Sequence, residues 1–207
     1  MAQYKLYGRQ GSGSLAVQVA LEEIGAPYER IWIADDPADV AQFRKISPTG
    51  KVPALALPDG LVMFESAAIL VHLSLEHPNA GLAPPPGTSQ HALFLQWMTF
   101  LSANAYEAAL RMYYSVRYST RGEGDAEPIR EQGTRDFLGH MELISRHLGP
   151  YVLGIRYSIA DVYLYMLASW SLAGKADLYA RLPALGLHAR QLSLRPAISK
   201  VEADHVV

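Results

Sequence analysis

The stretch Ile46 to Ser66, ISPTGKVPALALPDGLVMFES, contains the strongest fold signal in the chain. A strand-like run leads from Val52 to Leu57, and it is interrupted at once by Pro53. Proline has no backbone N–H and therefore cannot lie in the centre of a sheet without a special reason. Pro58-Asp59-Gly60 has the composition of a turn, and a second short run, Leu61 to Phe64, follows it. This order predicts a β-hairpin.

Glu65 and Ser66 come directly after the hairpin, where the hydrophobic period changes to a helical one at Ile69, Leu70 and Leu73. The first turn of a helix offers unpaired N–H groups and the positive end of the helix dipole, which suit a carboxylate ligand. A glutamate there can meet an ammonium group, while the serine hydroxyl meets a carboxylate. The Val52–Pro53 turn leaves the valine backbone able to pair with an extended peptide. Together these features suit a site for an amino acid or a short peptide.

SPTGKVPAL, followed by a turn, a short strand and ES, resembles the glutathione-binding half of the glutathione transferases. The resemblance covers essentially the whole chain and implies a cis Val52–Pro53 bond. It also implies that Glu65 and Ser66 hold the γ-glutamyl end of glutathione. The expected glutathione-binding residues are Tyr7, Lys51, Val52, Pro53, Glu65 and Ser66. The alternative interpretation is an ordinary hairpin with a proline at its edge and a Glu-Ser helix cap.

Length and composition limit the possible functions. The chain has 207 residues, which suffices for one large domain or two modest ones. Its net charge of −2 does not predict a nucleic-acid partner. No run of about 18 apolar residues is free of charges, so no membrane span is expected. The N-terminal residues MAQYKLYGRQ lack the apolar segment of a signal peptide. Cysteine is absent, which excludes disulfides and any cysteine nucleophile, and a cytoplasmic location fits best.

The first part of the chain alternates strand and helix patterns. The expected elements are a strand at 3–7, a helix at 14–24, a strand at 28–33, a short helix opening at Pro37, the hairpin and the helix after Glu65. This βαβαββα order predicts a small mixed sheet with helices on both faces. It is also the thioredoxin-like arrangement that the resemblance implies.

The second part of the chain reads as all-helical. Long helices are expected at 91–117 and from Pro128 to Gly149, with a third after Ser158-Ile-Ala-Asp161, whose spacing is that of a capping box. The family carries the same cap in its second domain. Residues 195–207 look like a loose tail. The predicted organisation is a thioredoxin-like glutathione-binding domain at 1–78, a proline-rich linker at 79–89 and an all-α domain at 90–207.

A transferase of this type needs a hydrogen-bond donor that stabilises the glutathione thiolate, since donors to the charged form lower a thiol pKa. The turn Gly11-Ser12-Gly13-Ser14 follows the first strand and precedes a helix N-terminus, so it is the expected place. Against the bacterial beta-class pattern Gly-x-Cys-Ser-Leu, Gly13 replaces the cysteine. Ser12 corresponds to the activating serine of delta-class members and is the first candidate. Ser14 is the second, with a purely capping role as its alternative, and Tyr7 or backbone N–H groups remain further candidates.

The second substrate is expected between the domains, where apolar and aromatic walls favour binding. The candidates recur at helical spacing on the first long helix: Tyr106, Leu110, Tyr113, Tyr114 and Arg117. An aromatic stripe can equally form the core of a helical domain. In the beta-class pattern a His-Lys pair on this helix reaches the site, and here Tyr106 and Glu107 replace it. Lys51 is then the nearest cation for the glycine carboxylate of glutathione.

The seven histidines do not predict a metal site. His140 and His147 share a helix face but lie two turns apart, which is too far for one ion to bridge. His72 and Glu76 are one turn apart and lack a third ligand nearby in the sequence.

The leading hypothesis is a cytoplasmic, homodimeric glutathione transferase with a role in detoxification, which uses glutathione as co-substrate, no metal, and a small hydrophobic electrophile. One alternative is another glutathione-dependent enzyme: an isomerase, peroxidase, dehalogenase or etherase. An isomerase for a small acid would need a cationic pocket, for which Arg9, Arg111 and Arg117 are the candidates. Another alternative is a non-catalytic glutathione-fold protein that serves as a carrier or assembly module.

Overall fold

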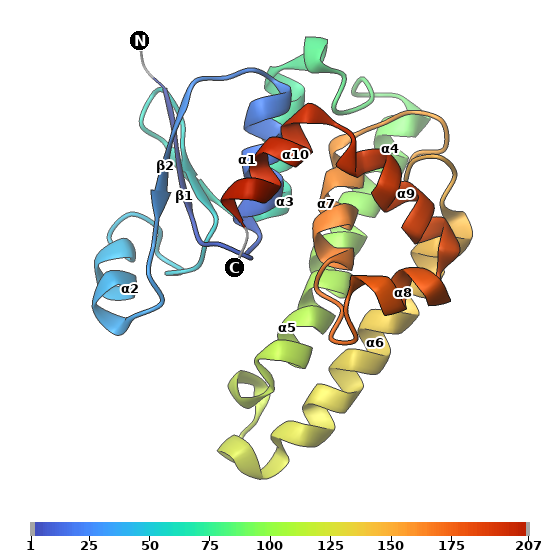
Figure 1. Cartoon of the computed structure of the whole chain (residues 1–207). Helices are drawn as coiled ribbons and strands as arrows, with labels where there is room; N and C mark the ends of the chain where they lie inside the picture. Colours follow the sequence, from blue (N-terminus) through green and yellow to red (C-terminus); the bar gives the residue numbers. More distant parts are fainter. Residues whose placement is uncertain (1–2, 206–207) are drawn as a thin grey trace. The chain divides into compact units, whose positions relative to one another are not determined.

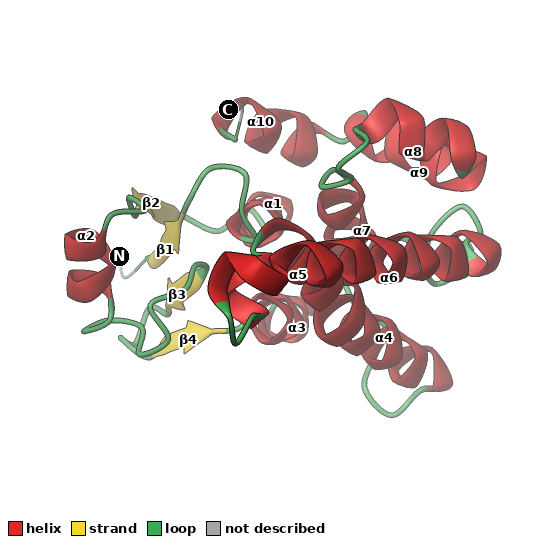
Figure 2. Cartoon of the chain, turned by 90° about the horizontal axis from the view of Figure 1, so that it is seen from below, coloured by secondary structure: helices red, strands yellow, loops and turns green. Residues whose placement is uncertain are grey.

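The computed structural model describes residues 3–205, which form two compact units. The first unit comprises Met1–Pro85 and Ser193–Val207, and the second comprises Pro86–Leu192. The chain thus passes from one unit to the other within the proline-rich stretch that the sequence predicts as a linker. Figure 1 labels the α-helices and the first two strands, and Figure 2 also labels the later strands.

The first unit is built on a four-stranded sheet in the order β2-β1-β3-β4. The strands are β1 (Tyr4–Gly8), β2 (Tyr28–Trp32), β3 (Ala54–Ala56) and β4 (Val62–Phe64). β1 pairs in parallel with β2 and antiparallel with β3, and β3 and β4 form the predicted hairpin. The thioredoxin-like βαβαββα order predicted from the sequence is confirmed.

Helices cover both faces of this sheet. Figure 2 shows α1 (Ser14–Glu23) and α3 (Ser66–Glu76) on one face and α2 (Pro37–Phe43) on the other. The buried core under α1 and α3 is aliphatic, with Leu6, Leu21, Leu55 and Leu70 fully excluded from solvent. α2 begins where the sequence places it, because the Asp36 carboxylate accepts from the backbone N–H groups of Ala38 and Asp39 at 3.0 Å each. A short 3₁₀ turn, η1 (Pro78–Ala80), follows α3.

The C-terminal segment also belongs to the first unit, as the helix α10 (Pro196–Asp204). The expected loose tail is therefore wrong for residues 195–205, whereas Val206 and Val207 lie outside the described residues. α10 packs against α1, with Ile198 and Val201 buried. An apolar pair on one helix face, flanked by charges that find partners on α1, is enough to dock so short a helix. The sequence-based domain scheme had placed these residues in the helical domain.

His205, directly after α10, is buried against the first unit. Its Nε2 lies 3.1 Å from Gln18 Oε1, its ring meets Trp32 edge-on at 5.2 Å, and its Nδ1 has no partner among the described residues. Burial lowers the pKa of His205 to about 4, and the Arg30 guanidinium lowers it too, against an opposing effect of Asp204. The ring is therefore neutral at pH 7, with its proton on Nε2 facing the glutamine.

The second unit is helical. Its elements are α4 (Ser89–Phe100), the π-helical segment η2 (Leu101–Tyr106), α5 (Glu107–Tyr113), η3 (Ser115–Tyr118), η4 (Gly122–Asp125), α6 (Ala126–His147), α7 (Ile159–Ala168), α8 (Lys175–Arg181) and α9 (Pro183–Ser193). The predicted single helix at 91–117 is thus three consecutive elements, and it ends at Tyr113. Residue Arg117 lies instead in the 3₁₀ turn η3.

The predicted capping box at the start of α7 is confirmed. The fully buried Asp161 carboxylate accepts from the N–H of Ser158 at 2.8 Å and from the N–H of Val152 at 2.7 Å. It also lies 2.9 Å from Nε2 of the buried His188, on α9. α7 is buried on all sides, which explains its continuous apolar sequence, and Asp161 ties it to two other segments of the unit.

Candidate functional site

The strand register brings three segments that are distant in the sequence to the same end of the strands, here called the edge of the sheet. Tyr7 lies opposite Ala54, and Ala54 lies opposite Phe64. The residues that follow or precede this row are therefore neighbours: Gly8 at the end of β1, Pro53 before β3 and Glu65 after β4. Because adjacent strands are about 4.8 Å apart, the row spans about 10 Å from β1 to β4.

Two helices begin at this same edge. α1 starts at Ser14 after β1, and α3 starts at Ser66 after β4; both pack on the same face of the sheet (Figure 2). Both helix dipoles therefore have their positive ends at the edge, which favours anionic groups there.

The turn between β1 and α1 carries the predicted hydroxyl donors. Ser12 Oγ lies 2.7 Å and Ser14 Oγ 3.0 Å from the carbonyl oxygen of Arg9, and the two hydroxyls are 2.9 Å apart. Ser12 Oγ also accepts from the N–H of Ser14 at 3.3 Å, and Ser14 Oγ accepts from the N–H of Arg9 at 3.2 Å. Ser14 is fully buried, whereas Ser12 is half-buried.

Ser14 does not cap α1, so the capping alternative is wrong. The N-cap residue is Gly13, which has no side chain to accept a hydrogen bond, and Ser14 is the first helical residue. Its hydroxyl instead bonds back to Arg9. Gly8 permits this close approach, because a Cβ on Gly8 would lie 2.7 Å from both Cβ and Oγ of Ser14.

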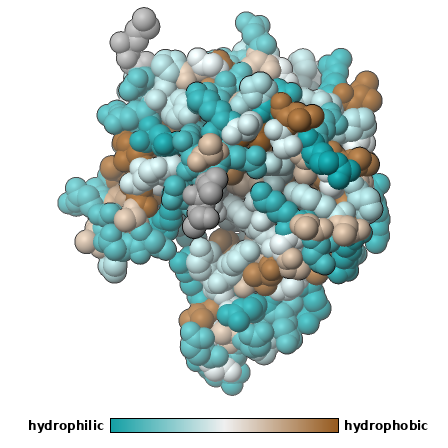
Figure 3. Space-filling view, in the orientation of Figure 1, coloured by the Kyte–Doolittle hydropathy of each residue, from teal (hydrophilic) through white to brown (hydrophobic). Residues whose placement is uncertain are grey.

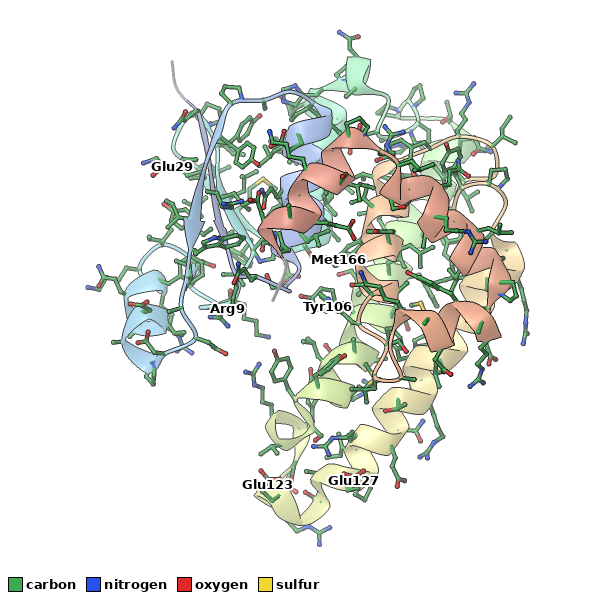
Figure 4. All side chains as sticks on the ribbon, in the orientation of Figure 1. Arg9, Glu29, Tyr106, Glu123, Glu127 and Met166 are labelled. Carbon is green, nitrogen blue, oxygen red and sulfur yellow. The ribbon has the colours of Figure 1, made fainter. Side chains whose placement is uncertain are left out.

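The Arg9 side chain anchors the turn to the segment after β2. Its guanidinium donates to the carbonyls of Ile33 and Ala34 at 3.1 Å each and pairs with Asp35 at 2.8 Å. Figure 4 shows Arg9 at the end of the sheet where β1 gives way to the turn. The Arg9 carbonyl, which lies near both the Ser12 and the Ser14 hydroxyl, therefore belongs to a residue whose side chain is held in place.

The segment before β3 has the predicted backbone. The Val52–Pro53 bond is cis, as expected from the resemblance. Within residues 3–205, no hydrogen bond engages the N–H or C=O of Val52, so both groups can pair with an incoming peptide. Lys51 beside it is exposed and forms no ion pair with another described residue.

Glu65 combines backbone strain with an unpaired charge. Its φ is +73°, the only positive φ among the described non-glycine residues. Such a conformation costs about 1–3 kcal/mol and persists where the surrounding structure imposes it, often at functional sites. The side chain is exposed, and its carboxylate has no partner in the described part of the chain. Ser66 next to it is buried at the start of α3.

Comparison with known proteins agrees with this geometry. The family model of the glutathione S-transferase N-terminal domain matches residues 14–75. A glutathione transferase homologue from Sulfitobacter, solved with bound glutathione, superposes with a TM-score of 0.89 at 26% identity and covers 100% of both chains. Over its whole length the chain is therefore similar in sequence and fold to glutathione transferases.

Sequence relatives within the glutathione transferase superfamily differ in activity. The glutathione S-transferase-like protein OpS6 of Beauveria bassiana is 27% identical and covers 96% of this chain and 94% of its own length. A maleylacetoacetate isomerase from Dictyostelium discoideum is 26% identical and covers 78% of this chain and 74% of its own length. Similarity to these proteins therefore leaves the specific reaction open.

Tyr7 lies apart from the turn that carries the Ser12 and Ser14 hydroxyls. Its ring packs on Phe43 of α2 with centroids 5.7 Å apart, so the side chain is on the α2 face of the sheet. The Ser12 and Ser14 hydroxyls belong to the turn that leads to α1, on the other face. Tyr7 is half-buried at the end of β1.

The five predicted second-substrate residues lie in the second unit, four of them on η2, α5 and η3 and Tyr114 between α5 and η3. They are not its core, because the buried positions of these elements are Leu101, Ala105, Ala108, Ala109, Met112 and Ser115. Tyr106 and Leu110 are half-buried, while Tyr113, Tyr114 and Arg117 are exposed. Tyr106, labelled in Figure 4, ends the π-helical segment, a feature often found at functional sites.

Two aromatic residues from α7 and the segment after it complete this group. Tyr106 contacts Tyr163 and Trp170, with ring centroids 6.3 and 5.0 Å away, and Tyr113 Oη donates to the Trp170 carbonyl at 2.8 Å. Burial, together with the neighbouring Tyr114, raises the pKa of Tyr113. In the sequence, the spacing of Tyr163 and Trp170 predicts only an apolar helix stripe, and no local pattern links them to Tyr106.

The three cation candidates differ in availability. Arg9 pairs with Asp35, and Arg111 pairs with Asp136 at 3.1 Å. Arg117 lies over the Tyr114 ring, 4.0 Å from its centroid, and forms no ion pair with any residue that the structure describes. Arg117 is therefore the candidate whose charge is left for a ligand.

Residues 3–205 contain neither a metal-binding group of side chains nor a helix that could span a membrane. No group of three or more His, Cys, Asp or Glu side chains in this range could hold a metal ion. None of the helices in it is both long and apolar enough to cross a bilayer. On the face that Figure 3 displays, hydrophobic residues form separate patches among hydrophilic ones.

Proposed function

We propose that the first unit binds glutathione and that the chain activates its thiol for attack on a small apolar electrophile. The observation that carries the proposal is the strained, unpaired Glu65, which lies at the same end of the sheet as the segment before β3 and the turn after β1. The Glu65 carboxylate would pair with the γ-glutamyl ammonium, and Ser66 with the α3 N-terminus would bind the adjacent carboxylate. Val52 would pair with the cysteinyl backbone, and Lys51 would meet the glycine carboxylate.

The proposed chemistry needs a thiolate, which the Ser12 hydroxyl would stabilise. The two serines hold two hydroxyl protons near one carbonyl oxygen, so one proton suffices for the Arg9 carbonyl. If Ser14 keeps that bond, the half-buried Ser12 can turn its proton to the sulfur. The sulfur lone pair then forms the C–S bond, while the electrophilic carbon releases its leaving group or moves an electron pair into a conjugated system. Tyr106, Leu110, Tyr113 and Tyr114 would provide the apolar surface for the electrophile.

Titration of the bound thiol tests the assignment. Ultraviolet absorbance follows the thiolate of bound glutathione against pH in the wild type and in S12A, S14A and Y7F. We expect a wild-type pKa below that of a free thiol, and a rise of about one unit in S12A, which is a tenfold loss of thiolate well below the pKa. Binding of S-methylglutathione, which has no thiol, should stay unchanged in S12A. A shift in S14A with none in S12A would reverse the assignment, and no shift in any variant would point to backbone N–H groups.

The function itself is tested by calorimetry with glutathione and by a panel of electrophiles. Failure to bind glutathione would refute the proposal. Binding without turnover of any electrophile would instead favour a carrier or assembly module. The same resemblance leads us to propose a cytoplasmic homodimer with a role in detoxification, and sedimentation analysis tests its oligomeric state.

The isomerisation of a small acid is a second candidate function. The unpaired Arg117 beside exposed tyrosines, together with a relative named maleylacetoacetate isomerase, favours it. Glutathione would add to a conjugated double bond and leave again after rotation, so it would not be consumed. Turnover of maleylacetoacetate that falls in R117M, with conjugation of neutral electrophiles unchanged, would establish this reaction.

A further inference from the structure

α10 packs antiparallel to α1 (Figure 1). Ion pairs to the C-terminal end of α1 hold the segment from Arg195 to Lys200. Arg195, just before α10, donates from Nε and Nη2 to both carboxylate oxygens of Glu23 at 2.7 and 2.8 Å. Lys200 Nζ donates to Glu22 at 2.8 Å. Both acids are at the C-terminal end of α1, so this segment is far along α1 from the hydroxyl turn.

Asp204, the last residue of α10, lies at the other end and contacts the turn itself. Its carbonyl oxygen accepts from Gln10 Nε2 at 3.2 Å, and Gln10 directly precedes Gly11 and Ser12. The last carbonyls of a helix have no partner within the helix, so Gln10 satisfies a group that α10 leaves open. The Asp204 carboxylate accepts from Gln18 Nε2 at 2.8 Å and pairs with Arg30 of β2. Asp204 thus joins the turn, α1 and β2.

Gln18 makes this junction rigid, because its buried amide is fully used. Nε2 donates to Asp204 and, at 3.1 Å, to Tyr28 Oη, while Oε1 lies 3.1 Å from Nε2 of His205. Tyr28 Oη in turn donates to Glu22 at 2.7 Å. Release of the end of α10 would remove two of the amide's partners, and an unsatisfied buried polar group is costly. The end of α10 is therefore tied to the core of the unit through the buried Gln18, whereas the Gln10–Asp204 bond itself lies at the surface.

We propose that Asp204 is a positioning residue for thiol activation: the end of α10 holds the turn that presents the Ser12 hydroxyl to the glutathione sulfur. This inference rests on the proposed function. Arg9 fixes one side of the turn to the segment after β2, and the Gln10–Asp204 bond fixes the other side. A hydroxyl that must meet a sulfur needs placement within about 0.5 Å, so both attachments matter for the thiolate.

The test compares two attachments of α10 in the full chain. Q10A removes the side chain that bonds the turn to the Asp204 carbonyl, and D204A removes the carboxylate that ties the end of α10 to Gln18 and Arg30. K200M removes an ion pair from the middle of α10 to Glu22, at the end of α1 away from the turn. The readouts are the pKa of bound glutathione and the affinity for S-methylglutathione. We expect D204A and Q10A to raise the thiol pKa by about half a unit to one unit, a loss of about three- to tenfold in thiolate well below the pKa. K200M should leave it unchanged, and all three should bind S-methylglutathione within about twofold of the wild type. D204N keeps an acceptor for Gln18 and should shift the pKa less than D204A.

The outcomes separate this inference from the proposed function. A depressed thiol pKa in the wild type that D204A and Q10A both leave unchanged would overturn the positioning role alone. A shift in K200M as large as in D204A would also overturn it, since general loosening of α10 would then explain the effect. If D204A does not fold, the exposed Q10A decides by itself. A wild-type protein whose bound glutathione titrates like free glutathione would overturn both proposals.

Discussion

Replacement of Glu65 by glutamine should weaken glutathione binding without disturbing the fold. The exposed carboxylate has no partner among the described residues, so its loss breaks no internal ion pair. In the complex, glutamine leaves the γ-glutamyl ammonium without its charged partner. A hydrogen bond to a charged group is worth about 1.5–3 kcal/mol, which corresponds to roughly a ten- to 150-fold loss of affinity.

Glycine at the same position separates strain from binding. The φ of +73° costs about 1–3 kcal/mol for glutamate, and glycine adopts it freely. Glycine also gains entropy in the unfolded chain, which offsets about 0.5–1 kcal/mol of the relief. E65G should therefore be as stable as the wild type or up to about 2 kcal/mol more stable, with a midpoint rise of about 2–4 °C per kcal/mol. Its affinity for glutathione should fall at least as far as that of E65Q.

Calorimetric titration and thermal unfolding of both variants measure these effects. E76Q is the matched control, because Glu76 ends the same helix at the opposite terminus. It should bind glutathione like the wild type. An E65Q variant that is folded and retains wild-type affinity would refute the role of Glu65 in binding. A loss of more than about 1 kcal/mol of stability in E65G would refute the strain argument.

Three further predictions concern stability and the turn. D161A should lower the free energy of unfolding, measured with denaturant, by about 3–5 kcal/mol. It removes the buried carboxylate that accepts from two backbone N–H groups and contacts His188. A free energy of unfolding within about 1 kcal/mol of the wild type would contradict this. Because the folded pKa of His205, about 4, is below its ordinary value, its contribution to stability is present above about pH 6.5 and is lost towards pH 4, by up to about 1.4 kcal/mol per unit. Subtraction of the H205Q unfolding curve from the wild-type curve should show this loss, and parallel pH profiles would exclude it. G8A should displace Ser14, raise the bound thiol pKa and destabilise by about 1–3 kcal/mol, whereas G139A, with open space at its Cβ, should be neutral or stabilising.

The first unit could be predicted well because its signals are local. The proline before β3, the turn Pro58-Asp59-Gly60 and the change of period at Glu65 are each visible within a few residues. The elements they predict are present within about two residues of the expected bounds. The strand register then places Tyr7, Ala54 and Phe64 in one row across the sheet. No local sequence pattern predicts this row directly. The cis Val52–Pro53 bond came from the resemblance and not from the physical signal of the residues.

The docking of α10 could not be read from the sequence, because it depends on partners about 170–190 positions away. Arg195, Lys200 and Asp204 look like ordinary surface charges until Glu23, Glu22 and Gln18 are known to lie opposite them. The π-helical segment before α5 was missed for a related reason. Its residues have no proline or glycine that would break the helix, so only the packing around Tyr106 reveals it.

The choice between Ser12 and Ser14 shows what a structure adds to a motif. In the sequence the two hydroxyls are equivalent donors two positions apart, and family patterns support either. In the fold they share one acceptor, the Arg9 carbonyl, and differ in exposure. A buried hydroxyl that keeps its bond to a fixed carbonyl maintains the shape of the turn, and a half-buried one can exchange that bond for a ligand. On our proposal the two serines therefore divide the work: Ser14 holds the turn together from within, and Ser12 meets the sulfur. The attachments of Arg9 and Asp204 matter for the same reason, because each holds the turn from which the Ser12 hydroxyl would donate its proton to the sulfur.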